Sequence, residues 1–252
     1  MKIEQANFEY YLRIGDNSLI LGHRLSEWCG HGPILEEDIA LINVALDLVG
    51  QSRFLLDAAA MLENKGRTED TLAYHRNANE FRNALLVEQP NGDFGRTIVR
   101  QFLFDAFSQL FYTELKLSKD GLLAAFSEKS IKEVDYHLRH SRDWMLRLGD
   151  GTSESHERVQ TALDELWMYT GDLFAMNEVD GLLINEGIAV DLNTIKTKWL
   201  KNVSQVIEEA TLVMPVNTYM QQGSKNGIHS EYLSYLLAEM QSIPRAMPDA
   251  IW

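Results

Sequence analysis

Apolar residues recur every three or four positions along most of the chain, a spacing that places them on one face of an α-helix. The first series includes Tyr11, Ile14, Leu21, Leu25 and Trp28. Alternation with a period of two, the pattern of strands, is almost absent. The pattern predicts an all-α protein with helices near residues 8–29, 33–63, 69–75, 94–115, 122–148, 157–175, 193–212 and 230–247.

Short breaks rich in glycine, proline and polar residues separate these helices, as at Gly30–Pro33 and Ser118–Gly121. Short connections favour antiparallel packing of neighbouring helices. We therefore predict one domain over residues 1–252. Its core bundle would span about 8–150, and a C-terminal helical extension about 151–252.

Composition and charge narrow the class of protein. The net charge is −14 at pH 7, which argues against binding to nucleic acid or to an anionic membrane surface. The most apolar run, Ile39–Val49, is broken by Asn43 and Asp47 and is too short to span a bilayer. The N-terminal residues lack the apolar core of a signal peptide. A single cysteine, Cys29, fits a reducing compartment. We expect a cytoplasmic protein without a membrane segment.

The stretch Ile131–Trp144 carries the clearest chemical signal. Four-helix metal bundles place a Glu-x-x-His pair on each of two helices, because residues i and i+3 project from one face toward a shared centre. His137 occupies the histidine position of such a pair, but Val134 stands where the glutamate belongs. The flanking acids Glu133 and Asp135 each lie about 100° round the helix. The pattern indicates a metal site that has lost its ligands.

The other ligand positions follow from counting residues outward from the two predicted turns. Residues on antiparallel helices lie side by side when they are equally far from the turn that joins the helices. Helices one and three would each supply a carboxylate, and helices two and four a Glu-x-x-His pair. The residues at these levels are Asn17 or Ser18, Leu48, Gln51, Asp105, Val134 and His137. Only Asp105 and His137 are ordinary metal ligands, and two donors do not hold a pair of iron ions. We therefore predict no metal and no catalytic residue in this chain.

Several short sequence segments, taken in order, resemble the C-subunit family of the bacterial ring-1,2-phenylacetyl-CoA epoxidases. These enzymes are multicomponent monooxygenases of aerobic phenylacetate breakdown. The resemblance covers essentially the whole chain, down to the final tryptophan. The matching phrases are Arg24–His31, Leu46–Gln51, Leu86–Gly92, Lys132–His140, Gly223–His229 and Trp252.

The resemblance implies a ferritin-like helical bundle without cofactor that supports a related catalytic A subunit, which carries the di-iron centre. It also implies contacts with the B subunit and the reductase. A homodimer is a further possible assembly. Leu48, Gln51 and Val134 differ from the Glu-x-x-His pattern of the catalytic subunit, and this difference favours the structural role.

Alternative interpretations remain for single residues and for the whole chain. Asp105 and His137 could bind a lone ion, although a buried polar pair is the simpler interpretation. Lys225 and His229 lie in a loop that could meet the phosphates of an acyl-CoA or an acidic partner surface. The chain could thus be an acyl-CoA-binding module. It could also be a carboxylate-bridged oxidase that uses Asp105 and His137 with Glu133, Asp135 or Asp47.

Overall fold

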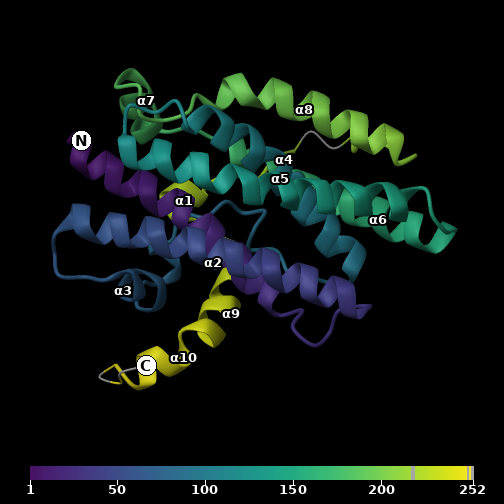
Figure 1. The fold of residues 1–252 in the computed structure, drawn as a ribbon, viewed down its shortest axis with the longest axis horizontal. Helices are drawn as coiled ribbons and strands as arrows, with labels where there is room; N and C mark the ends of the chain where they lie inside the picture. Colours follow the sequence, from purple (N-terminus) through teal and green to yellow (C-terminus); the bar gives the residue numbers. More distant parts are fainter. Residues whose placement is uncertain (217–218, 249, 251–252) are drawn as a thin grey trace. The chain divides into compact units, whose positions relative to one another are not determined.

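The computed structural model describes residues 1–216, 219–248 and 250, so the terminal Trp252 of the resemblance lies outside the described residues. The described part is helical and contains no strand, which confirms the predicted all-α, ferritin-like class. The elements, labelled in Figure 1, are α1 (Ile3–Ser26), α2 (Leu35–Glu63), α3 (Glu69–Tyr74), η1 (Ala78–Glu80), α4 (Phe94–Leu115), α5 (Gly121–Gly149), α6 (Ser153–Leu166), η2 (Trp167–Phe174), α7 (Glu178–Asn185), α8 (Leu192–Glu209), η3 (Ser224–Asn226), α9 (Glu231–Met240) and α10 (Ser242–Ala246).

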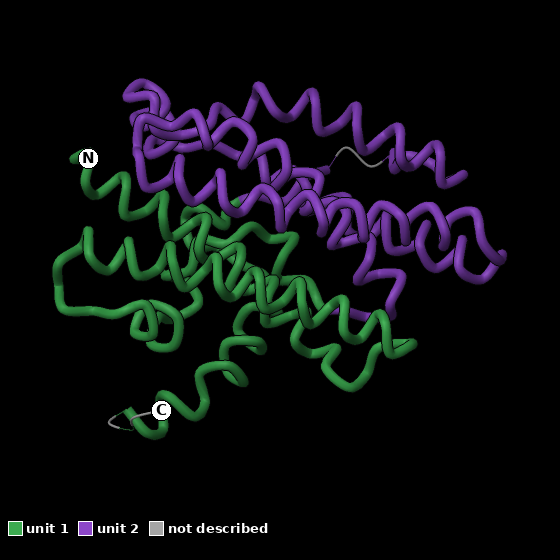
Figure 2. Tube along the Cα trace, viewed as in Figure 1, with its two compact units in different colours: residues 1–90, 223–252 green, residues 91–222 purple. Residues whose placement is uncertain are grey.

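The chain forms two compact units, drawn in different colours in Figure 2. Unit 1 comprises residues 1–90 and 223–252, and unit 2 comprises residues 91–222. The division does not fall near residue 150, where we placed the start of the C-terminal extension. The described residues from 223 to 248 belong to the same unit as the N-terminal helices.

Unit 1 is built on the antiparallel hairpin of α1 and α2. Leu21, Leu25, Leu41 and Leu55 are fully buried in its core. Gly15 and Gly22 allow close packing of the two helices, because a Cβ at Gly22 would lie 3.3 Å from the carbonyl oxygen of Ala45. The antiparallel packing predicted from the short connection between these helices is present.

Unit 2 is centred on α4, which packs against α5, α6 and α8. Most of α4 from Thr97 to Ser108 is buried on all sides, as expected of a helix inside a core. On α8, Trp199 donates from Nε1 to the carbonyl oxygen of Leu103 at 3.1 Å, and its ring stacks on Trp167. These aromatic residues are core residues of unit 2.

Side-chain caps fix where the central helices begin. Asp93 accepts a hydrogen bond from the backbone N–H of Arg96 at 2.8 Å, and Asp120 does the same for Leu122 at 2.9 Å. An N-terminal aspartate also interacts favourably with the helix dipole. The predicted starts of these two helices are confirmed.

Two predicted helices are interrupted. The helix predicted over 157–175 is α-helical only to Leu166 and then tightens into the 3₁₀ segment η2. The helix predicted over 230–247 is divided at Gln241 into α9 and α10. The short helix α7 was not predicted, because eight residues carry too few apolar repeats to show a period.

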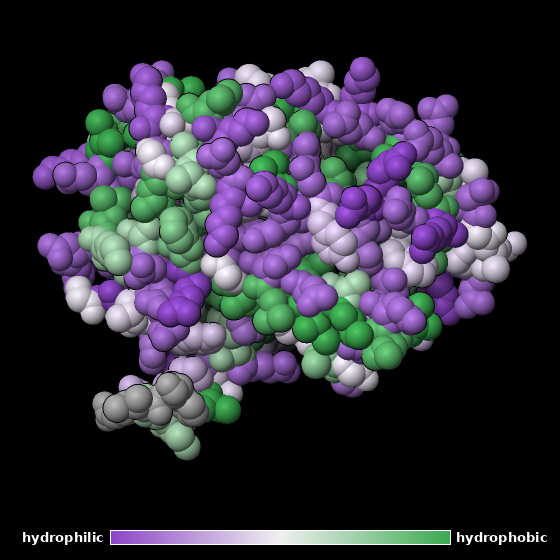
Figure 3. Space-filling view, viewed as in Figure 1, coloured by the Kyte–Doolittle hydropathy of each residue, from purple (hydrophilic) through white to green (hydrophobic). Residues whose placement is uncertain are grey.

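Helix α2 is long and apolar enough to cross a membrane by length and composition, with a mean hydropathy of 1.5 in its most apolar window. In the structure 44% of that window is buried, and the helix packs on α1. Its outer face remains apolar. Leu35 is 71% exposed and Leu46 is 63% exposed, and hydrophobic side chains gather over the first half of α2 (Figure 3).

Candidate functional site

The predicted polar remnant in unit 2 is a buried cluster around Asp105. Gln101 donates from Nε2 to Oδ1 of Asp105 at 2.7 Å, and Ser141 donates from Oγ to Oδ2 at 2.8 Å. Asp105, Gln101, Ser141 and His137 are each at most 2% exposed. The helices α4 and α5 thus bring Asp105 and His137 into one buried environment, and the role of this pair stays a prediction.

Burial dominates the electrostatics of this cluster. It raises the pKa of Asp105 from 3.8 to about 6, although the charge of His137 and the hydrogen bonds from Ser141 and Gln101 act in the opposite direction. A carboxyl group with this pKa exchanges a proton close to physiological pH. Asp105 is thus a buried carboxyl group that accepts hydrogen bonds from side chains of α4 and α5.

The contact that Asp105 makes across α4 and α5 differs from the one expected by counting residues from the turn. Counting from the turn set Asp105 level with Val134, but its hydrogen bond goes to Ser141, about two helical turns farther along α5. Side chains lean toward the N-terminus of their own helix. Asp105 therefore leans away from the turn and Ser141 leans back toward it. Val134 is itself buried, with 3% of its surface exposed.

The predicted ligand positions in unit 1 have other roles. Asn17 accepts a hydrogen bond at Oδ1 from the backbone N–H of Ala84 at 2.7 Å. Ser18 donates to the carbonyl oxygen of Ile14 at 3.4 Å within its own helix. Leu48 and Gln51 are 3% and 4% exposed. These side chains bind backbone or fill the core of unit 1.

The residue types do not fit a di-metal centre. Of the seven predicted positions, only Asp105 and His137 carry an ordinary ligand for iron. Within the described ranges, no three His, Cys, Asp or Glu side chains converge closely enough to hold a metal ion. Glu133 is partly exposed on α5, and Asp135 is exposed. The residue types at these positions therefore do not supply the ligands of a di-iron centre, and the absence of a cofactor from this chain stays a prediction.

Two buried acids in unit 1 were missed or misjudged from the sequence. Asp16 on α1 is fully buried and forms a two-point ion pair with Arg76. It also accepts from the backbone N–H of Arg82 at 2.8 Å. Glu88, in the loop after η1, is fully buried as well. No local pattern pairs Asp16 with a residue sixty positions away.

The loop that carries Lys225 and His229 is anchored through His229. Nδ1 of His229 lies 2.8 Å from Oε2 of Glu88, and Nε2 lies 3.0 Å from the carbonyl oxygen of Phe81. Its side chain is only 4% exposed. Both ring nitrogens are therefore engaged inside unit 1. Lys225 lies in η3, and the proposed role of this loop toward an acyl-CoA or a partner stays a prediction.

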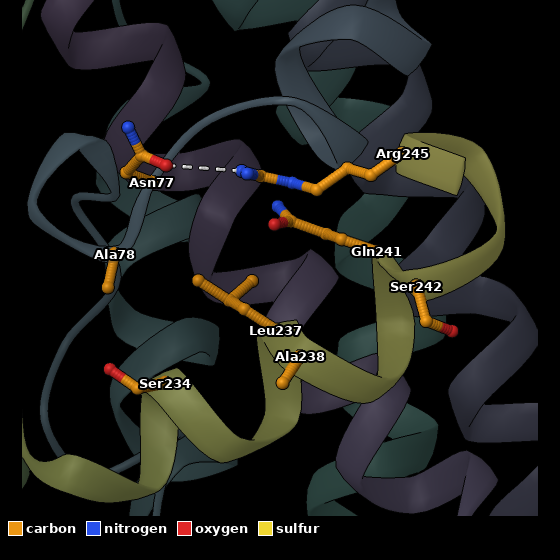
Figure 4. A pocket seen from close by; sticks show the side chains of 8 residues that line it. All are labelled: Asn77, Ala78, Ser234, Leu237, Ala238, Gln241, Ser242 and Arg245. Atoms are coloured by element: carbon orange, nitrogen blue, oxygen red, sulfur yellow. Dashed lines mark hydrogen bonds between the residues drawn. The ribbon is translucent and has the colours of Figure 1, made fainter. Parts of the chain in front are cut away.

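Both units have surface hollows, and the largest of those described here, about 420 Å³ in unit 2, is lined by ion-paired side chains that include Arg96 and Glu165. Two smaller hollows have fewer charged residues. In unit 1, a hollow of about 220 Å³ lies between η1 and α9–α10, with Leu237 pointing into it and Arg245 reaching over it to Asn77 (Figure 4). In unit 2, a hollow of about 220 Å³ between α4, α5 and α8 has Phe102 and Arg142 among its lining residues. Neither contains a convergent set of catalytic side chains.

Comparison with known proteins identifies the family of the chain. The profile of the phenylacetic acid catabolic protein family matches residues 1–252. The chain is also 49% identical over 243 residues to the C subunit of 1,2-phenylacetyl-CoA epoxidase from Escherichia coli (strain K12), a match that covers 96% of this chain and 98% of that protein. The chain therefore belongs to the phenylacetic acid catabolic protein family.

Proposed function

We propose that this chain is the non-catalytic structural subunit of a bacterial phenylacetyl-CoA epoxidase. The observation that carries this role is the 49% identity, over nearly the full length of both chains, to the C subunit of such an epoxidase. A relationship of this extent covers both compact units. The chain would work beside a related catalytic A subunit that holds the di-iron centre.

The residues at the ligand positions support the absence of chemistry in this chain. Leu48 and Gln51 take the place of one Glu-x-x-His pair, and Val134 breaks the other. Leu48 and Val134 are buried apolar residues, which supply packing where ligands would bind metal. Asp105 keeps a buried carboxyl group that is hydrogen-bonded within its own unit.

The surface of α2 supports a role in binding other subunits. Leu35, Ile39, Leu46 and Met61 on this helix are at least half exposed, and exposed apolar patches commonly mark protein interfaces. We propose the A subunit as the main partner, with the B subunit and the reductase as further members of the complex. We also propose that the chain can form a homodimer and that it is located in the cytoplasm.

Metal analysis of the purified chain, expressed alone in iron-replete medium, tests the lack of chemistry. We expect less than about a tenth of an equivalent of iron, manganese or zinc, because two donors are too few for hard divalent ions. A value near two equivalents of iron would refute the structural role. Glu133, Asp135 and Asp47 would then become candidate ligands of an oxidase.

Reconstitution tests the role in the complex independently. The A subunit, the B subunit and the reductase are assayed for epoxidation of phenylacetyl-CoA with and without this chain. We expect activity to depend on the chain and to survive in an Asp105→Asn variant. Full activity without the chain would contradict the proposal. Calorimetric titration of the isolated chain with phenylacetyl-CoA separates the acyl-CoA-binding alternative, which requires affinity without any partner.

A further inference from the structure

Residues 223–246 form a segment that returns to the N-terminal helices of unit 1, and we call it the C-terminal clamp. Gly227 lies against the backbone of Asn79 so closely that a Cβ would overlap its carbonyl oxygen. On α9, Leu233, Leu236 and Leu237 are at most 5% exposed. The clamp is therefore packed on unit 1 by an apolar face and by a close backbone contact.

Polar contacts hold the two ends of the clamp. At its far end, Gln241 donates from Nε2 to the carbonyl oxygens of Ala73 and Arg76 at 3.1 and 3.0 Å. Arg245 also donates to the carbonyl oxygen of Arg76, at 2.8 Å. At its near end, Glu88 accepts at Oε1 from the backbone N–H of Ser230 at 2.6 Å.

The near end contains a titratable contact. Both ring nitrogens of His229 face acceptors, namely the carboxylate of Glu88 and the carbonyl oxygen of Phe81. A neutral imidazole donates from only one nitrogen, so both contacts are hydrogen bonds only when the ring is a doubly protonated imidazolium. The side chain of Asn83 donates to the same carboxylate at 2.9 Å, so Glu88 receives donors from both sides.

We propose that the C-terminal clamp is a proton-linked latch, closed by the imidazolium of His229 between Glu88 and Phe81 and loosened when that ring loses a proton. Deprotonation removes one of the two hydrogen bonds of the ring and its positive charge beside the fully buried carboxylate of Glu88. Asn83 still donates to Glu88, and Arg82 still donates to the carbonyl oxygen of Phe81. A buried carboxylate is less stable when it loses a neighbouring positive charge. The apolar face of α9 stays packed in either state, so the latch changes the opening equilibrium of the clamp rather than releasing it.

The groups around the His229 ring favour its protonated form. Burial by itself lowers the pKa of His229, but the hydrogen bond and charge of Glu88, the Phe81 carbonyl and the charge of Asp16 raise it above its ordinary value of 6.5. From α1, Arg24 donates to the carbonyl oxygen of Glu88 and to that of Tyr232. The guanidinium of Arg76 is occupied by Asp16.

The sign of the effect follows from linkage. A raised pKa in the closed state means that protons favour closure, so closure is fully supported below pH 6.5. It weakens as the pH rises through the raised value. Between these two values the opening equilibrium increases by up to about tenfold for each pH unit. Opening would expose Glu88 and would remove one wall of the hollow between η1 and α9–α10.

Hydrogen exchange followed by mass spectrometry from about pH 6 to about pH 9 tests the latch on the full chain. After correction for intrinsic exchange rates, we expect the protection of residues 231–240 in α9 to fall severalfold as the pH rises. Residues 192–209 in α8 provide the internal reference. Parallel changes in both helices would overturn the proposal.

Two further measurements distinguish the titration of His229 from a general loss of stability at high pH. In a His229→Gln variant, we expect the pH dependence of α9 to disappear. A His156→Gln variant should keep it, because His156 contacts the carbonyl oxygen of Gly149 in unit 2. If His229→Gln does not fold, the titration of His229 by NMR in the wild-type chain decides. A midpoint at or below the ordinary value of 6.5 would overturn the latch.

Discussion

Replacing Asp105 with asparagine is the most direct test of the buried cluster in unit 2. The substitution keeps the size of the side chain and one acceptor oxygen for Gln101 or Ser141, but removes the ionisable group. The pKa of Asp105 is raised from 3.8 to about 6 by burial. Folding therefore favours the protonated form of this carboxyl group, and the charged form is the one that costs free energy.

The magnitude follows from the pKa. A rise from 3.8 to about 6 corresponds to about 3 kcal/mol of stability that is present in acid and lost as the pH increases through this window. Between about pH 4.5 and about pH 7.5 the free energy of unfolding falls by about 2 kcal/mol of that total. This fall occurs in the wild-type chain and not in the Asp105→Asn chain. The difference in stability between them should therefore shift by about 2 kcal/mol in favour of the variant.

Urea titrations of both proteins at about pH 4.5, 6 and 7.5 measure the difference. Asp135→Asn is the matched control, because Asp135 is exposed on α5 and should produce no comparable shift. A constant difference between wild type and Asp105→Asn across the pH range would show that Asp105 titrates normally. A shift of opposite sign would show that a cation holds Asp105 in its charged form, which would revive the metal-binding alternative.

Three further substitutions test other parts of the fold. Arg76→Met should lower the free energy of unfolding by about 3–5 kcal/mol in a urea titration, because it leaves the fully buried Asp16 without its counter-charge; an unchanged midpoint would contradict that role. Gly149→Ala should cost about 1–3 kcal/mol in thermal unfolding, because the new Cβ would overlap the carbonyl oxygen of Ala210; equal melting temperatures would show that the backbone yields freely. Cys29→Ser should change stability by less than about 0.5 kcal/mol, because Cys29 is exposed and its thiol is free; a larger loss in the same assay would indicate a contact in solution.

Periodicity predicted the long helices well because their signal is repeated many times. Helix α5 repeats its apolar positions over 29 residues, and Asp120 marks its start. Helix α7 has eight residues and was missed. The break at Gln241 was missed for a different reason, since its side chain binds the carbonyl oxygens of Ala73 and Arg76, which are distant in the sequence.

The candidate site was predicted in residue type but not in its contacts. The positions of Asp105 and His137 on facing helices followed from the turn between them, and both are buried in one cluster. The hydrogen bond to Ser141 did not follow, because counting residues from a turn gives backbone levels while contacts depend on the direction in which side chains lean. His229 lies in a loop as predicted, but its anchoring contact with Glu88 did not follow from the sequence.

The sequence by itself determined the helical class, the missing metal ligands and the family, because these depend on residue identity and on local spacing. Tertiary structure alone decided which buried charges are paired. Asp16 and Arg76 are separated by 60 positions, and Glu88 and His229 by 141. Each pair forms because burying one charge alone is unfavourable. Nothing in the residues next to either partner records which distant segment the fold brings against it.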